Sequence, residues 1–113
     1  MENCLFCKIA AGQIPSNKIY EDDKVLAFYD IYPQAPVHFL VIPKEHIACA
    51  DQIDGTNSAI VAHIFEVIAK IAKDLKLEKG YRIVNNCGED GGQTVGHLHF
   101  HVLGGRLLAW PPG

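Results

Sequence analysis

Three histidines near the C-terminal end of this 113-residue chain stand at alternate positions, His97, His99 and His101. Successive side chains of a strand point to opposite faces. The three imidazoles are therefore predicted to share one face, with the intervening apolar residues in the core. Imidazole binds metals, exchanges protons near neutral pH and attacks phosphorus. Three interpretations compete: a solvated strand face, a metal site, and phosphate chemistry in which one imidazole attacks while its neighbours donate hydrogen bonds or protons.

A glycine-rich loop at residues 88–92 directly precedes these histidines and is followed by Gln93 and Thr94. Glycines let backbone N–H groups approach an anion, and the two polar side chains add neutral donors. The loop lacks the lysine and the spacing of a P-loop. A glycine loop placed directly before three alternating histidines favours phosphate chemistry over the other two interpretations.

The chain has four cysteines, Cys4, Cys7, Cys49 and Cys87. Cys4 and Cys7 are three residues apart and would share one face of a short helix. In a reducing compartment such a pair more often binds a metal or does redox chemistry than forms a structural disulfide. Zinc binding, two buried thiols and a redox pair all remain open. We interpret Cys49 and Cys87 as incidental, and likewise His63, which we place at the surface or edge of a long helix.

Hydrophobic periodicity and turn residues predict one short helix, one long helix and five strands. The short helix begins with Asn3 as its cap and ends near Ala11, before Gly12; the long helix spans residues 57–77 and stops at Gly80. The strands are expected at residues 18–20, 25–29, 38–42, 81–86 and 97–103. Because most connections are short, these elements imply an α+β fold with an antiparallel sheet.

The composition, 49% hydrophobic and 20% charged, fits a single domain over residues 1–113. The net charge of −3 argues against nucleic-acid binding, because proteins that grip nucleic acid usually have a basic face. No segment approaches the ~20 apolar residues of a membrane helix, and the N-terminus lacks the pattern of a secretory signal. We therefore expect no membrane partner and a cytoplasmic location. The tail, residues 107–113, contains Trp110-Pro111-Pro112 and can be neither regular helix nor central strand.

The segment His97-Leu98-His99-Phe100-His101-Val102-Leu103 matches every position of the motif His-φ-His-φ-His-φ-φ, in which φ is apolar. The chain resembles the histidine-triad (HIT) family that carries this motif, and in particular its HINT branch of nucleotide-binding proteins. The segments that carry this likeness span nearly the whole chain: Phe6-x-Lys8-Ile9, Asp30-Ile31, residues 33–44, residues 79–82, Gly91-Gly92-Gln93, residues 103–106 and residues 110–113.

The resemblance implies a homodimeric purine nucleoside phosphoramidase. Each protomer would have a five-stranded antiparallel sheet with one long and one short helix, and the sheet would extend across the dimer. The implied reaction cleaves adenosine or guanosine 5′-phosphoramidates to the nucleoside monophosphate and an amine, through a nucleotidyl intermediate on His99. His101 and His38 would contact the phosphate, and Thr94 would supply a proton to the amine. No cofactor is required for this chemistry.

A nucleotide pocket is also implied by the resemblance. Asp30 would hold the ribose hydroxyls, a recurrent role for an acidic residue, although an aspartate at a strand end is also common in turns. Four apolar residues would line the base pocket: Phe6, Ile9, Phe28 and Ile31. Of these, Phe28 and Ile31 would serve equally well as ordinary core residues. Asn86 and Gly92, together with Thr94, would hold the phosphate or the leaving group.

Some relatives that carry Cys-x-x-Cys bind zinc, and the resemblance implies the ligand set Cys4, Cys7, His46 and His97. Such a closed site would be structural. Two other functions remain open. One is a dinucleoside polyphosphate hydrolase, from which Gly104-Gly105-Arg106 and the Trp-Pro-Pro tail point away. The other is a nucleotide-binding adaptor with little turnover.

Overall fold

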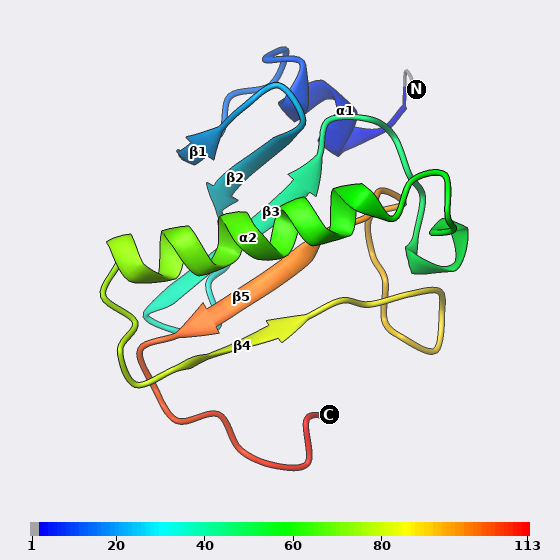
Figure 1. The fold of residues 1–113 in the computed structure, drawn as a ribbon. Helices are drawn as coiled ribbons and strands as arrows, with labels where there is room; N and C mark the ends of the chain where they lie inside the picture. The colour runs from blue at the N-terminus through cyan, green and yellow to red at the C-terminus, as the bar shows by residue number, and fades with distance from the viewer. Residues whose placement is uncertain (1–2) are drawn as a thin grey trace.

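The computed structural model describes residues 3–113. Met1 and Glu2, which belong to the N-terminal segment assessed for a secretory signal, lie outside the described residues. Five antiparallel strands form one sheet in the order β1-β2-β3-β5-β4 (Figure 1). Their bounds are Lys18–Glu21 (β1), Val25–Tyr29 (β2), Val37–Pro43 (β3), Tyr81–Val84 (β4) and Phe100–Gly104 (β5). The predicted α+β class with an antiparallel sheet is confirmed.

Two helices cover opposite faces of this sheet. The long helix α2 (Ala59–Asp74) lies across one face (Figure 1), where Ile64 and Ile68 pack with Phe39 of β3. The short helix α1 (Leu5–Ala10) lies on the other face, where Phe6 packs with Leu40 of β3. Neighbouring residues of one strand therefore enter different clusters, as the alternation of side chains along a strand requires.

The start of the last strand differs from the prediction. β5 begins at Phe100 rather than His97, because the backbone before Phe100 forms hydrogen bonds with loop residues instead of a strand. The N–H of Leu98 donates to the carbonyl of Ile47 at 2.6 Å. The neighbouring strand β3 ends at Pro43, which has no N–H to offer to a longer ladder. Alternation nevertheless continues: Leu98 packs in the cluster beneath α2, while the rings of His97 and His99 contact Phe6 on the opposite face.

Both helices are shorter than the sequence predicts. The cap of α1 is Cys4 rather than Asn3, and its Sγ accepts from the N–H of Cys7 at 3.3 Å. α2 runs from Ala59 to Asp74, whereas the predicted helix spans residues 57–77. Lys76 adopts a left-handed φ of 58°, and the N–H groups of Lys76 and Leu77 return to carbonyls in the last helical turn. A lysine thus adopts the left-handed conformation that glycine usually adopts at a helix C-terminus. The prediction relied on Gly80 as the stop signal and therefore placed the end of the helix too late.

The remaining boundaries shift by one or two residues. β4 ends at Val84, two residues before the predicted end at Asn86, while β1 and β3 are slightly longer than predicted. A short 3₁₀ helix, η1 (Ala50–Gln52), has no counterpart in the prediction.

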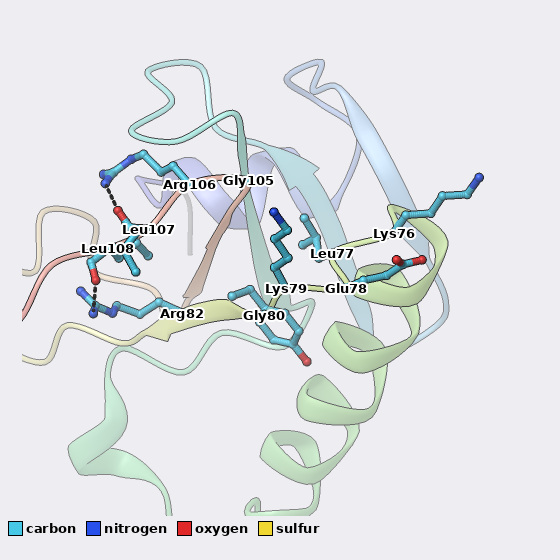
Figure 2. A pocket seen from close by; sticks show the side chains of 11 residues that line it. Lys76, Leu77, Glu78, Lys79, Gly80, Arg82, Gly105, Arg106, Leu107 and Leu108 are labelled. Atoms are coloured by element: carbon cyan, nitrogen blue, oxygen red, sulfur yellow. Dashed lines mark hydrogen bonds between the residues drawn. The ribbon is translucent and has the colours of Figure 1, made fainter.

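The tail, residues 107–113, has no helix or strand, as predicted. Arg82 of β4 donates to the carbonyl of Leu108, and Arg106 donates to the carbonyl of Leu107 (Figure 2). Within residues 3–113, no helix has the length and apolar character needed to span a bilayer.

Candidate functional site

His99 is held in one orientation by its own segment. Its Nδ1 lies 2.7 Å from the backbone carbonyl oxygen of His97, which can only accept, so Nδ1–H donates. In a neutral imidazole with this tautomer, the lone pair is on Nε2. The ring of Phe6 packs edge-on against His99, with ring centroids 5.1 Å apart, and His99 is only 4% exposed. Nε2 is therefore the atom through which His99 can act as a base or nucleophile.

A chain of hydrogen bonds orients the other two site imidazoles. The backbone N–H of Gln34 donates to Nδ1 of His38 at 3.1 Å, so a neutral His38 carries its proton on Nε2. That Nε2 lies 2.9 Å from Nδ1 of His101. His101 thus accepts at Nδ1, and its own proton is on Nε2. The chain leaves His101 with an Nε2–H that is free to donate to a ligand.

Burial keeps these two imidazoles neutral at pH 7. Burial, followed by the neighbouring His99 and His38, lowers the pKa of His101 to about 4, with Asp30 acting in the opposite direction. Burial also lowers the pKa of His38, again against Asp30. The 3.5 Å approach of Asp30 Oδ2 to His38 Nε2 is therefore a contact to a neutral ring rather than an ion pair. Neutral rings preserve the tautomers that the hydrogen-bond chain sets.

Sequence reasoning missed two groups that position the imidazoles. The side-chain amide of Asn85 donates to the backbone carbonyl of His99 at 2.9 Å. The N–H of Gln34 begins the chain through His38. A backbone donor leaves no signal in the sequence, whereas Asn85 stands directly before Asn86, to which the resemblance had drawn attention.

The residues predicted to bind a nucleoside lie in two different settings. Phe6, Ile9 and Phe28 are buried together in the cluster between α1 and the sheet, next to His99. Asp30 lies at the end of β2 beside His38, and its Oδ1 accepts from the N–H of Tyr32 at 2.8 Å. Ile31, by contrast, is 82% exposed. The structure thus brings Asp30 and the aromatic residues to the triad but leaves Ile31 in solvent.

Polar groups in the loop before the triad form hydrogen bonds with backbone carbonyls of the protein. The amide of Gln93 donates to the carbonyls of Ala48 and Val95, so it is not a free donor beside the histidines as predicted. The N–H of Gly92 donates to the carbonyl of Glu89. Asn86 is half-buried, and Thr94 is exposed on a pocket that Cys4 and His46 also line.

Cys4, Cys7, His46 and His97 form one cluster, in which the sulfur and nitrogen atoms all lie within 4.8 Å of one another. Sγ of Cys4 is 3.2 Å from Nδ1 of His97, and Sγ of Cys7 is 3.2 Å from Nδ1 of His46. Nε2 of His97 lies 2.8 Å from the carbonyl of Pro43 and so carries the proton, which leaves Nδ1 free to bind a metal.

The chemistry of this donor set fits zinc. Two thiolates and two imidazoles are a common tetrahedral zinc set. Burial and the adjacent Cys4 raise the pKa of Cys7 and so disfavour its thiolate form. A bound cation would favour the thiolate and lower this pKa again. Within residues 3–113, the three triad imidazoles do not gather on one point: His97 faces the cysteines while His101 faces His38 and Asp30. A single metal site made of all three is therefore wrong.

Comparison with known proteins decides the family. The sequence model of the HIT domain matches residues 11–108. The chain belongs to the HIT family. It is 51% identical to a HIT-like protein of Synechococcus elongatus over 99% of this chain and 98% of the relative.

Two solved structures give the same result. A crystal structure of a HIT family hydrolase from Legionella pneumophila matches with a TM-score of 0.96 and 51% identity, over 98% of this chain and all of that one. A histidine triad nucleotide-binding protein from Candida albicans matches with a TM-score of 0.82 and 37% identity, over 96% of this chain and 83% of that one. The five-stranded antiparallel sheet with one long and one short helix is thus the HIT fold.

The HIT match covers the triad but not every element of the site. It includes His38, His99 and His101, whereas α1, with Cys4 and Cys7, precedes the matched residues. The Cys/His cluster therefore joins a segment outside the HIT match to His46 and His97 inside it. The match to the HIT family therefore does not by itself indicate whether this chain binds a metal at Cys4 and Cys7.

Proposed function

We propose that this HIT protein hydrolyses purine nucleoside 5′-phosphoramidates, of adenosine or guanosine, to the nucleoside monophosphate and an amine. The observation that carries the proposal is the hydrogen bond from Nδ1–H of His99 to the carbonyl of His97, because it directs the Nε2 lone pair away from the protein backbone. Two similar structures are named a HIT family hydrolase and a histidine triad nucleotide-binding protein, which supports a hydrolase that acts on nucleotides.

The proposed reaction has two half-steps. In the first, Nε2 of His99 attacks the α-phosphorus, the P–N bond breaks, and the leaving amine takes a proton from Thr94. The carbonyl of His97 stabilises the positive imidazole ring through Nδ1–H. In the second, water attacks the phosphorus, the P–Nε2 bond breaks, and the proton from water restores the donor. His101 donates its Nε2–H to a phosphate oxygen throughout, and His38 supports the phosphate site by holding His101 in this tautomer.

Nucleotide recognition follows from the groups around His99. Asp30 accepts hydrogen bonds from the ribose hydroxyls, and Phe6, Ile9 and Phe28 form the apolar wall against the base, with Ile31 closing over it from the surface. Asn86 and Gly92 contact the phosphate or the leaving group. The burial of Phe6, Ile9 and Phe28 in one cluster beside His99 supports this arrangement.

The decisive experiment is to trap the nucleotidyl enzyme. Adenosine 5′-phosphoramidate is mixed with the protein for less than one turnover, quenched in alkaline denaturant, and the peptides are analysed by mass spectrometry. We expect one nucleotidyl group on His99. His99→Ala should lose several powers of ten in kcat/KM yet still bind AMP, while the control His63→Gln on α2 should keep the kcat/KM and the AMP binding of the wild type.

Three outcomes decide against the proposal. Activity of His99→Ala within about tenfold of the wild type removes His99 as the nucleophile. Faster cleavage of diadenosine polyphosphates than of phosphoramidates makes the protein a dinucleoside polyphosphate hydrolase. AMP binding without turnover of either substrate makes it an adaptor.

We also propose that Cys4, Cys7, His46 and His97 hold a structural zinc ion, which ties α1 to the triad segment. Four protein ligands leave no open position for substrate, so the metal contributes to folding rather than to the reaction. The 3.2 Å contacts between each cysteine and a histidine Nδ1 support this set.

A paired substitution separates zinc from chemistry. Cys4→Ser with Cys7→Ser should lose zinc in atomic spectroscopy and lower the melting temperature, yet keep much of the activity at low temperature. Cys49→Ser is the matched control and should keep its zinc. Loss of activity on chelation, with an unchanged circular dichroism spectrum, would instead make the metal part of the chemistry.

A further inference from the structure

Cys49 and Cys87 have no part in the proposed function, yet the fold places them together. Cys49 lies directly before η1, and Cys87 follows β4 in the loop before the triad. Their Sγ atoms lie within 4.8 Å of each other, with a carboxylate oxygen of Asp51 inside the same distance. Both cysteines are half-buried, so small reagents can reach them.

The backbone on either side of this pair is held by contacts that do not involve the thiols. The amide of Gln93 donates to the carbonyl of Ala48 at 2.8 Å and accepts from the N–H of Gly88 at 2.9 Å, which joins the two cysteine segments. Gly91 packs so closely on Cys87 that a Cβ there would lie 2.4 Å from the Cys87 carbonyl oxygen. The proximity of the thiols is thus a consequence of the fold.

We propose that Cys49 and Cys87 are a redox modification site, which forms an intramolecular disulfide by exchange with a low-molecular-weight disulfide such as oxidised glutathione. One thiolate attacks the small disulfide, forms a mixed disulfide and releases one small thiol. The second thiolate attacks the protein sulfur of the mixed disulfide and releases the other. Overall, two protein thiols are oxidised to a disulfide while one small disulfide is reduced to two thiols, and the two protons lost by the protein thiols end on the two released thiols.

The donor count favours a disulfide over a second metal site. Two sulfurs and one carboxylate provide three ligands, whereas a closed zinc site needs four, and the third residue, Asp51, is exposed.

The electrostatics of Cys87 set the expected rate. A hydrogen bond from the backbone of Asp51 lowers the pKa of Cys87, but burial, the adjacent Cys49 and the negative charge of Asp51 outweigh it and raise the pKa from its ordinary value. Exchange should therefore be slow at pH 7 and faster at pH 9, because only the thiolate attacks.

Formation of the disulfide would close a covalent ring around a large part of the fold. The ring encloses η1, α2 and β4, and it ties the loop that holds Asn85 to the segment that follows His46. Closing a ring of about 40 residues restricts the unfolded chain, and on the entropic account it raises the melting temperature by roughly 15–20 °C.

The test uses the full chain in its zinc-loaded form, incubated with oxidised glutathione at pH 8 and then alkylated and cleaved with trypsin. Cleavage after lysine and arginine places Cys49 in residues 45–70 and Cys87 in residues 83–106, while Cys4 and Cys7 stay together in residues 1–8. We expect a cross-link between the first two peptides, a higher melting temperature, and reversal of both by dithiothreitol.

Two single variants provide the controls. Cys49→Ser should give a glutathione adduct on Cys87 and no rise in melting temperature on oxidation, and Cys87→Ser should show the converse. The proposal is overturned if the cross-link joins two chains, if only residues 1–8 are oxidised, or if the linked protein melts no higher than the reduced one. Binding of added Zn²⁺ that is lost in either variant would make the pair a metal site instead. None of these readouts depends on phosphoramidase activity.

Discussion

The imidazole of His99 is oriented by groups that are neither acidic nor basic. The carbonyl of His97 sets its tautomer, and the amide of Asn85 holds the backbone carbonyl of His99 itself. His101 is set in the same way, through His38 and a backbone N–H. The carbonyl of His97, the amide of Asn85 and the N–H of Gln34 do not titrate, and burial lowers the pKa of His38, so these partners are uncharged at pH 7.

Asn85 is a positioning residue, since it acts on His99 and not on the substrate. Asn85→Ala should lower kcat by roughly 10–100-fold, because small misplacements of a nucleophile are costly, and should leave KM for the nucleotide nearly unchanged. Asn57→Ala is the matched control, because the Asn57 amide makes a comparable bond to the carbonyl of Gln52 away from the triad. Steady-state kinetics at a temperature well below unfolding measures both. A kcat for Asn85→Ala within twofold of the wild type would refute the role.

The sequence indicated which residues belong to the candidate site better than it indicated how their side chains are arranged. The motif marked all three triad histidines, and the Cys-x-x-Cys spacing marked two members of the metal cluster. The residue pattern alone did not separate His97 from the other two histidines, and only the resemblance assigned His97 to the metal ligands and His99 and His101 to the phosphate. The separation depends on long-range contacts of His97 with Cys4 and with Pro43.

At the scale of elements, the turn between β1 and β2 is fastened to α2. Asp22 in this turn accepts from the N–H groups of Lys24 and Val25, and its other oxygen lies 2.7 Å from Nε2 of His63 on α2. His63 lies half-buried on α2, in agreement with its predicted place at the edge of the long helix, and its contact with Asp22 is a structural one that the sequence analysis did not foresee. Its partner is distant in sequence, so no local pattern indicates the contact.

The Asp22 contacts make stability depend on pH. Burial opposes ionisation, but hydrogen bonds from Lys24, His63, Val25 and Tyr20 outweigh it and hold the pKa of Asp22 well below its usual range. The folded-state pKa is thus below the unfolded value of about 3.9. Ionised Asp22 stabilises the fold above that pH, and the stabilisation is lost as the pH falls towards the folded-state pKa.

Asp22→Asn should lower the free energy of unfolding by about 1–2 kcal/mol at pH 7, with a smaller difference from the wild type at pH 3. Urea unfolding at both values measures this difference. Asp23→Asn makes the same charge change at an exposed position of the same turn and should alter stability by less than about 0.5 kcal/mol. Equal losses for the two variants would show that net charge, not the Asp22 contacts, is responsible.

Helices and strands with a strong periodic pattern of apolar residues were predicted correctly over most of their length. Several of their end residues were predicted incorrectly. The core of α2 and the strand β2 follow directly from the pattern of apolar residues. The left-handed Lys76 and the late start of β5 arise from tertiary hydrogen bonds, which compete with local preference.

At the scale of the whole molecule, we propose a two-fold dimer joined along β4. β4 is an edge strand with an unpaired side, and its Tyr81 is 39% exposed. A pocket beside this strand is lined by the loop between α2 and β4 (residues 76–80), by Tyr81 and Arg82 of β4, and by residues 105–108 (Figure 2). A small domain gains buried surface from such an interface.

Light scattering at micromolar concentration should give twice the 12.4 kDa mass of the chain. Tyr81→Lys should weaken the dimer, because a lysine on an edge strand opposes pairing. Tyr32→Lys changes an exposed aromatic residue away from β4 and should leave the mass unchanged. A wild-type mass of 12.4 kDa would refute the dimer.

The sheet order has a consequence for synthesis of the protein. β5 follows every other strand in the sequence, yet it lies between β3 and β4. The growing chain therefore cannot close its sheet until β5 has left the ribosome, and until then β3 and β4 each lack a neighbour. A product that stops before Phe100 loses an interior strand, not an outer one, and leaves strand edges open to other chains. Messages with premature stop codons in this region should yield insoluble fragments, not smaller folded domains.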